Sequence, residues 1–217
     1  MSVSSEILKK KYGFKFPFKP DPLARKSLHY INGGKRLLDI GCGEGPDSVF
    51  FAKKGFQVTA FDANPSYLKR LRKFRTHHNM RSITILCRDA IKYRYPRNYY
   101  DVINCLLVIC CMKRSEFDKM LKPLKQSVKP GGIIIISARN YLDPDLNGYR
   151  SSQKMIEPNT FRHKEDCCKF AYFIEKGLLR KVFSDFEILY YFEGYVPCKY
   201  NEHPKHGDSN IICRRKY

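Results

Sequence analysis

One short segment constrains the fold of this chain more than any other. Residues 37–40 read as a buried strand, and they run directly into a loop with glycines at positions 41, 43 and 45. Pro46 follows, and proline suits the first position of a helix because the N–H that it lacks would be unpaired there anyway. A glycine loop between a strand and a helix lets backbone amides approach a ligand and directs a helix N-terminus toward it. The segment therefore predicts a ligand site at the end of a strand.

Strands and helices are expected to alternate along the first two thirds of the chain. Apolar runs at 36–40, 56–61, 82–87 and 100–106 are typical of strands, and segments 46–54, 65–77 and 115–128 of helices. Residues 129–132 (Lys-Pro-Gly-Gly) read as a break before the uninterrupted apolar run Ile133 to Ile136. Strands that are apolar on both faces indicate a parallel sheet covered by helices. The pattern predicts an α/β fold, a doubly wound Rossmann-like sheet of about seven strands.

The last third of the chain changes character. Residues 139–171 read as polar and irregular, and a helix is expected at about 172–181. Two apolar segments, 186–192 and 209–214, are expected to pair as an antiparallel edge of the sheet. We expect a lead-in at 1–30 that lies over the ligand cleft, and a single domain at 31–217. Within that domain, residues 139–171 are expected to form an irregular insertion on the substrate side.

The charge of the chain is strongly basic. The 217 residues carry a formal net charge of +20, and segment 69–97 holds ten Lys and Arg residues against the single acid Asp89. Such a segment favours RNA, another polyanion or an anionic surface as a partner. Solvated helix faces in a lysine-rich protein are the alternative interpretation, because lysine outnumbers arginine in this chain.

No sequence pattern predicts a membrane span, a leader or a metal site. The longest apolar run, 103–112, is too short to cross a bilayer and contains Asn104. No N-terminal segment has the pattern of a secretory signal. The nine cysteines include no Cys-x-x-Cys pair and are expected to be reduced and structural. We therefore expect a cytoplasmic protein, either a monomer or a homodimer.

Three aspartates follow or end the expected strands. An acidic residue about 20 positions beyond a glycine loop accepts hydrogen bonds from ribose hydroxyls in nucleotide-binding units, and Asp62 has that position. Asp89 is placed to contact an adenine amino group, with Ala90 packing nearby. Asp39 is placed either to order the loop or to meet a ligand ammonium group. The alternative is that Asp39 and Asp62 only cap neighbouring helices.

The glycine spacing separates two kinds of ligand. The NAD and FAD fingerprint is Gly-x-Gly-x-x-Gly. Here positions 46 and 47 are proline and aspartate, so that fingerprint fails. The tighter spacing Gly41-x-Gly43-x-Gly45 suits the methionine end of S-adenosylmethionine.

Together, segment 37–45, Asp62, Asp89, the strand that begins at Tyr100 and segment 129–132 resemble the class I S-adenosylmethionine-dependent methyltransferases. The segments 11–13, 55–62 and 183–190 are most similar to the tellurite-resistance methyltransferases within that class. Two features of those proteins differ here: Pro46 and Asp47 replace an Arg-Asn pair, and a segment from His203 to His206 replaces a His-Arg step. The motifs and the resemblance imply these cofactor-binding residues: Tyr12, Asp39, Gly41, Cys42, Gly43, Gly45, Asp62, Ala63, Asp89, Ala90 and Leu106.

The resemblance implies an enzyme that transfers a methyl group from S-adenosylmethionine, leaving S-adenosylhomocysteine, to a small nucleophile such as a thiol or a chalcogen oxyanion. His203 and His206 are the candidate catalytic bases, and His163 is a weaker one. The alternative is that the histidines are exposed loop residues. Two further hypotheses stay open: an RNA-directed methyltransferase that uses the basic segment 69–97, and a partner subunit that binds the cofactor without catalysis. The sequence lacks the motifs of enzymes that methylate nucleobases.

Overall fold

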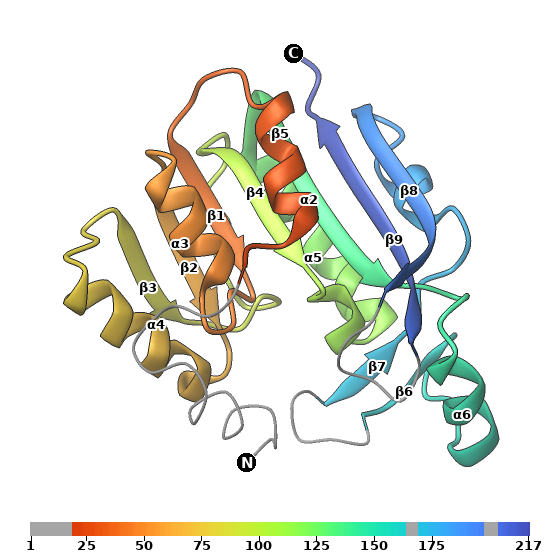
Figure 1. Ribbon diagram of the computed structural model, residues 1–217. Coiled ribbons are helices and arrows are strands. Elements are labelled where there is room, and N and C mark those ends of the chain that lie inside the picture. The colour runs from red at the N-terminus through yellow and green to blue at the C-terminus, as the bar shows by residue number, and fades with distance from the viewer. Residues whose placement is uncertain (1–18, 164–168, 198–203) are drawn as a thin grey trace.

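The computed structural model describes residues 19–163, 169–197 and 204–217. A seven-stranded sheet in the order β3-β2-β1-β4-β5-β9-β8 runs through its centre (Figure 1). Strands β1 to β5 are parallel, whereas β9 is antiparallel to both β5 and β8. This confirms the predicted doubly wound α/β fold with an antiparallel C-terminal edge. The strands are β1 (Arg36–Ile40), β2 (Gln57–Asp62), β3 (Ile83–Cys87), β4 (Tyr100–Leu106), β5 (Val128–Arg139), β8 (Glu187–Pro197) and β9 (Lys205–Arg214).

Helices cover both faces of the sheet. Successive residues of a strand point to opposite faces, so apolar strands have apolar side chains to bury on each side. Leu37 packs into the core shared with α2 (Pro22–Ser27), α3 (Pro46–Lys53) and α4 (Pro65–His77). Leu38 packs into the other core, with α5 (Arg114–Ser127) and α7 (Leu178–Val182). Figure 1 shows α2 and α3 in front of the sheet and α5 behind it. Two short 3-10 helices, η1 (Leu28–Tyr30) and η2 (Ile109–Cys111), complete these connections.

The helices next to the glycine loop begin where the sequence predicts. Pro46 is the first residue of α3, directly after Gly45, which has a φ of 87°. Helix α4 begins at Pro65, and the side chain of Asn64 accepts a hydrogen bond of 2.9 Å from the Ser66 amide. Such caps satisfy backbone donors that have no partner within the helix. Local chemistry therefore fixes both helix starts at this edge of the sheet.

The prediction of a break at 129–132 is wrong, because these residues lie inside β5. The pairing of β4 with β5 is irregular here: Tyr100 pairs with Val128, and Val102 pairs with Ile133. The extra residues bond instead to the C-terminal segment, since the Gly131 amide donates to the Arg215 carbonyl (2.8 Å). A φ of 78° at Gly131 explains why glycine is needed there.

The described part of segment 139–171 contains more regular secondary structure than expected. It contains α6 (Asp145–Ser152), β6 (Thr160–Arg162) and the start of β7 (Phe170–Tyr172), and β6 pairs with β7 as a separate two-stranded sheet. Widely spaced apolar side chains, hidden among polar residues in the sequence, form a small core of their own: Leu146, Tyr149, Phe161, Ala171 and Phe173. The helix predicted at about 172–181 is shorter and begins later than expected. Tyr172 ends β7, and α7 begins at Leu178 after Gly177, whose φ is 69°.

The topology brings the functional candidates to one edge. Parallel strands β1 to β4 all end at the edge where the glycine loop lies, and α6, β6 and β7 lie at the lower right of the same edge in Figure 1. Within the described residues, no helix is both long enough and apolar enough to cross a membrane.

The small core in segment 139–171 is expected to contribute to stability. Phe161 is 1% exposed, so Phe161→Ala should lower the free energy of unfolding by about 3–5 kcal/mol through lost burial and a cavity. Ile156→Ala is the control, because Ile156 is 39% exposed and its truncation should cost less than about 1 kcal/mol. Chemical denaturation measures both variants. Equal effects of the two substitutions would contradict a packed core in this segment.

Candidate functional site

The candidate site lies where the connections of the sheet diverge. Strands β1 and β4 are neighbours, but the chain continues from β1 toward β2 and from β4 toward β5, on the opposite side. The helices that follow these two strands, α3 and α5, cover opposite faces of the sheet. In open α/β sheets such a divergence leaves a crevice at the carboxyl ends of the strands, where ligands bind. The glycine loop is located at this point.

The three glycines of the loop have different surroundings. All have positive φ angles: 62° at Gly41, 53° at Gly43 and 87° at Gly45. A Cβ atom at Gly41 would lie 2.4 Å from Val108, and one at Gly45 would lie 2.4 Å from Leu71. A Cβ atom at Gly43 would meet no described residue within 4 Å. Gly41 and Gly45 therefore allow the loop to pack against protein, whereas the space at Gly43 is open in the described part of the chain.

Asp62 links the end of β2 to the glycine loop. One carboxylate oxygen accepts a hydrogen bond from the Gly43 amide (2.9 Å), and the other accepts one from the Asn64 amide (2.8 Å). A carboxylate offers about four acceptor positions, so further acceptor capacity remains on both oxygens. The side chain is half-buried, at the end of the strand that the sequence predicts.

Asp39 is buried beneath the loop. Its two carboxylate oxygens accept hydrogen bonds from the Ser48 hydroxyl (2.5 Å) and from the Asn104 side-chain amide (2.9 Å). Burial raises the pKa of Asp39 to about 6 despite these two donors. Of the two roles expected from the sequence, this geometry favours ordering the loop. Ser48 and Asn104 were missed as contributors, although a polar residue within the apolar run 103–112 was a usable signal.

The other predicted cofactor residues surround the same edge. Asp89 is exposed after β3, and its carboxylate accepts a hydrogen bond of 2.8 Å from the Ile91 amide. Ala63 follows Asp62 and is exposed, whereas Ala90 and Leu106 are half-buried. Cys42 is buried within the glycine loop, and burial raises the pKa of its thiol. Tyr12 lies outside the described residues.

Of the predicted catalytic histidines, the structure describes His206. It lies in strand β9, which corrects the expectation of a loop there, and its Nε2 is 3.5 Å from Asp208 Oδ1. Burial, with the nearby Arg139 guanidinium, lowers the pKa of His206, so the imidazole is neutral at pH 7. His203 lies outside the described residues. His163, the weaker candidate, follows β6 and lies beside Tyr149, with ring centroids 6.4 Å apart.

The structure brings further acids to this edge that sequence reasoning missed. Asp143 follows β5, and Asp208 pairs with Arg139 across β5 and β9. Burial raises the pKa of Asp208 to about 7, and Asp21 and Asp143 act in the same direction, whereas Arg139 lowers it. Asp47 at the start of α3 has its pKa raised to about 7, mainly by burial and then by Asp39. The residues around each acid in the sequence did not indicate a shared site, because these acids come together only in the folded chain.

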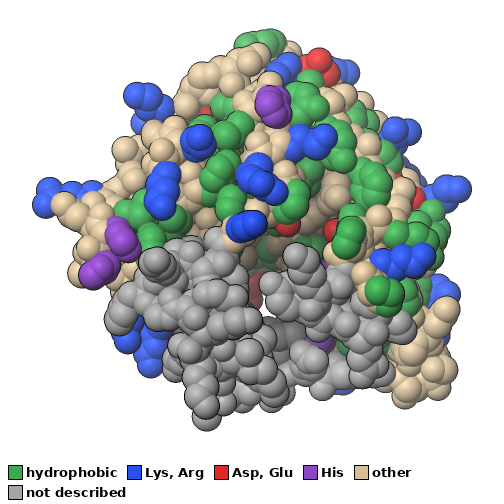
Figure 2. All heavy atoms as spheres, viewed as in Figure 1, with side chains coloured by type: hydrophobic (Ala, Val, Ile, Leu, Met, Phe, Trp, Pro, Cys, Tyr) green, Lys and Arg blue, Asp and Glu red, His purple; other side chains and the backbone are tan. Residues whose placement is uncertain are grey.

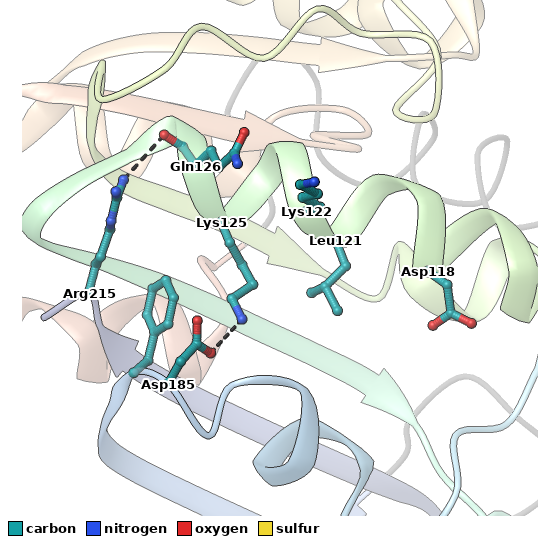
Figure 3. A pocket seen from close by; sticks show the side chains of 8 residues that line it. Asp118, Leu121, Lys122, Lys125, Gln126, Asp185 and Arg215 are labelled. Atoms are coloured by element: carbon teal, nitrogen blue, oxygen red, sulfur yellow. Dashed lines mark hydrogen bonds and ion pairs between the residues drawn. The ribbon is translucent and has the colours of Figure 1, made fainter.

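A separate pocket lies near the opposite edge of the sheet (Figure 3). Its volume is about 340 Å³, and the ion pair between Lys125 Nζ and Asp185 Oδ1 (2.5 Å) crosses it. The other lining residues come from α5 and from the ends of β8 and β9: Asp118, Leu121, Lys122, Gln126, Phe186 and Arg215. None of the predicted site residues that the structure describes lines this pocket, so we do not include it in the candidate site.

Among the described residues, no cluster of three or more His, Cys, Asp or Glu side chains could hold a metal ion.

Comparison with known proteins points to one family. A family model described as a methyltransferase domain matches residues 37–132, which include the glycine loop, Asp62 and Asp89. Glycine N-methyltransferase of Oryctolagus cuniculus is 29% identical over 125 residues, covering 51% of this chain and 42% of that protein. Thiol S-methyltransferase TMT1B of Homo sapiens is 26% identical over 165 residues, covering 75% of this chain and 66% of that protein.

The fold extends beyond the segment matched by the family model. The crystal structure of TehB from Haemophilus influenzae superposes on 97% of this chain and on 66% of its own chain, with a TM-score of 0.72 and 20% identity. At that identity the likeness concerns the fold. The chain spans less than half the length of the glycine N-methyltransferase that it matches.

The raised pKa of Asp208 predicts a pH-dependent effect on stability. Between about pH 4 and 7 the folded protein keeps a proton on this group that the unfolded chain has lost, so the free energy of unfolding falls across this range and stays reduced above pH 7. Asp208→Asn removes the ionisation and should raise the free energy of unfolding at pH 8 by about 2 kcal/mol, with little effect at pH 4. Urea denaturation at the two pH values measures the difference. The matched control is Asp185→Asn, and an equal effect of Asp208→Asn at both pH values would contradict the prediction.

Proposed function

We propose that this chain is a class I methyltransferase that transfers a methyl group from S-adenosylmethionine to a small nucleophilic acceptor. The observation that carries the proposal is the space at Gly43, which no described residue fills, beside the carboxylate of Asp62. Backbone without a side chain can approach the methionine end of the cofactor closely. Asp62 retains acceptor positions for the ribose hydroxyls beyond its two backbone hydrogen bonds.

The remaining cofactor contacts are assigned by position. We propose that Asp89 accepts from the adenine amino group, and that Ala63, Ala90 and Leu106 provide apolar contacts to the cofactor. In this assignment Asp39 holds the loop through Ser48 and Asn104 rather than binding the cofactor directly. The rest of the proposed set comprises Gly41, Cys42 and Gly45 in the loop, with Tyr12 from the N-terminal segment.

The proposed reaction needs little covalent chemistry from the protein. The sulfonium cofactor supplies a methyl group that is already electrophilic, so the protein mainly aligns the acceptor with it. An acceptor that must lose a proton also needs a base. His206 is the proposed base because its imidazole is neutral at pH 7 and lies at the edge that holds the glycine loop. His203 is proposed for the same role from its place in the sequence.

Thiols and chalcogen oxyanions are the proposed acceptors. One of the relatives is a thiol S-methyltransferase, which is compatible with a thiol acceptor for this chain. We propose that residues 31–217 form one domain and that segment 139–171 lies on the acceptor side. We further propose that the lead-in at 1–30 belongs to the cofactor cleft. Its described end supports this, because the Asp21 amide donates a hydrogen bond of 2.8 Å to Asp47 in the first turn of α3.

The basic surface supports a second candidate function, methyl transfer to RNA. Helix α4 buries Leu68, Leu71 and Phe74 and directs its basic side chains outward. The exposed ones are Lys69, Arg72, Lys73 and Arg75. A row of this kind can bind phosphates, and such binding weakens steeply as salt rises.

Cofactor binding is expected to depend on Asp62. Asp62→Ala removes the proposed ribose acceptor and the partner of the Gly43 amide, so affinity for S-adenosylmethionine should fall about 10-fold or more. Isothermal titration calorimetry measures the change, with Asp118→Ala on the surface of α5 as the control. Unchanged affinity in Asp62→Ala would remove the ribose assignment.

Acceptor class is tested by transfer of a labelled methyl group from S-adenosylmethionine to separate pools of thiols, tellurite and RNA. Labelling of small thiols or tellurite is the expected result. Labelling of RNA that declines steeply between about 50 and 200 mM salt would favour the second candidate. Calorimetric binding of the cofactor without label in any pool would favour a non-catalytic partner subunit.

A further inference from the structure

A group of charged residues lies where β5 ends and β9 begins. Arg139, the last residue of β5, pairs with Asp208 of β9, and Asp143 follows a few residues after Arg139. The two segments are in tight contact at Gly207, where a Cβ atom would lie 2.4 Å from both Asn140 Oδ1 and the Asp143 amide nitrogen. We call Arg139, Asp143, His206 and Asp208 the β5–β9 cluster.

The β5–β9 cluster continues the candidate cofactor site along the same edge. Asp21 acts electrostatically on Asp208, and the Asp21 amide donates to Asp47 at the start of α3. Asp47 in turn lies within electrostatic range of Asp39, beneath the glycine loop. The cluster therefore lies at the same edge of the sheet as the proposed cofactor site, on the side of β5 and β9 rather than that of β2 and β3.

Among the described residues of the cluster and its neighbours, negative charge exceeds positive charge. The permanent cation of the β5–β9 cluster is Arg139, which lies 2.8 Å from Asp145 and 3.9 Å from Asp143. The carboxyl groups of Asp143 and Asp21 also interact electrostatically with that of Asp208. His206 adds no charge, because its pKa is lowered. A chain with a net charge of +20 thus places an acidic region at the edge where an acceptor would bind.

Several buried polar atoms here have no hydrogen-bond partner among the described residues. They include Asp143 Oδ2 and Asp208 Oδ1, on residues that are 3% and 7% exposed. Each of these oxygens has a basic side chain at ion-pair distance, Arg139 at 3.9 Å and His206 at 3.5 Å, without a hydrogen bond. His206 Nδ1 also has no hydrogen-bond partner among the described residues. Buried polar atoms are nearly always paired, so acceptors of this kind indicate a missing donor. A ligand that donates several hydrogen bonds and carries positive charge would satisfy them.

We propose that the β5–β9 cluster binds an ammonium group of the methyl acceptor, with Asp208 and Asp143 as its carboxylate partners. The proposal rests on the methyl transfer proposed above and narrows its acceptors to small molecules that carry an ammonium group. An ammonium group has three donors and one positive charge, and it can therefore donate charge-assisted hydrogen bonds to two carboxylates. An anionic acceptor such as a chalcogen oxyanion would instead meet charges of its own sign.

The test compares three thiols of similar size but different charge: 2-aminoethanethiol, 2-mercaptoethanol and mercaptoacetate. Methyl transfer from labelled S-adenosylmethionine gives kcat/KM for wild type, Asp208→Asn and Asp143→Asn. The ratio of wild type to variant for each thiol cancels the intrinsic reactivity of that thiol. Asp185→Asn, an exposed pair partner of Lys125 at the opposite edge, is the matched control. Ethanolamine as a fourth acceptor shows whether the amine itself takes the methyl group.

Asp208→Asn should lower kcat/KM for 2-aminoethanethiol about 10-fold or more, as expected for loss of a charge-assisted hydrogen bond. The change for 2-mercaptoethanol should be less than about threefold, and mercaptoacetate should improve, because a repulsive charge is removed. Asp143→Asn should act in the same direction, and Asp185→Asn should change none of the three. Equal losses for all three thiols would overturn the ammonium site while leaving methyl transfer intact.

If no thiol is methylated, binding decides the proposal separately. Calorimetric titration of 2-aminoethanethiol into wild type saturated with S-adenosylhomocysteine should give binding that weakens about 10-fold in Asp208→Asn. Absence of binding to wild type, or equal binding to both proteins, would overturn the ammonium site. Calorimetry with the cofactor product alone reports whether the proposed cofactor site itself has failed.

Discussion

The buried carboxyl group of Asp39 holds together the elements on which the candidate site depends. It accepts hydrogen bonds from Ser48 in α3 and from Asn104 in β4, and it lies in β1 just before the glycine loop. Burying a carboxyl group is costly unless donors satisfy it, so both partners are needed for the arrangement to be stable. The position of Gly43, and with it the space beside Asp62, follows from this junction.

Much of this junction could be predicted because its signals are local. The glycines, Pro46 and Pro65 act through their own backbone geometry, and the capping side chain of Asn64 reaches only two residues ahead. The uninterrupted apolar run of β5 likewise indicates a strand buried on both faces without knowledge of its neighbours. The polar residue in β4 had a signal too, since Asn104 interrupts an apolar run, but its partner Asp39 is 65 positions away.

Features that depend on distant partners could not be predicted. Lys129–Gly132 has the composition of a turn, yet pairing with the C-terminal segment keeps these residues in β5. In segment 139–171, apolar residues such as Phe161 are too far apart to show a period, and they acquire meaning only when they meet in one core. Segment 205–208 reads as a loop, and pairing with β5 and β8 makes it the start of β9.

The distribution of charge distinguishes the outside of the molecule from its candidate site. On the face seen in Figure 2, Lys and Arg side chains project outward, whereas the acidic side chains near the centre of the view lie recessed. Exposed charges are solvated and screened, so a high positive total has little influence on what a recessed site binds. Buried carboxyl groups are different, because burial itself raises the pKa values of Asp47 and Asp208, and neighbouring carboxyl groups raise them further. The charge that we propose for the acceptor therefore rests on this small buried group of acids and not on the +20 of the whole chain.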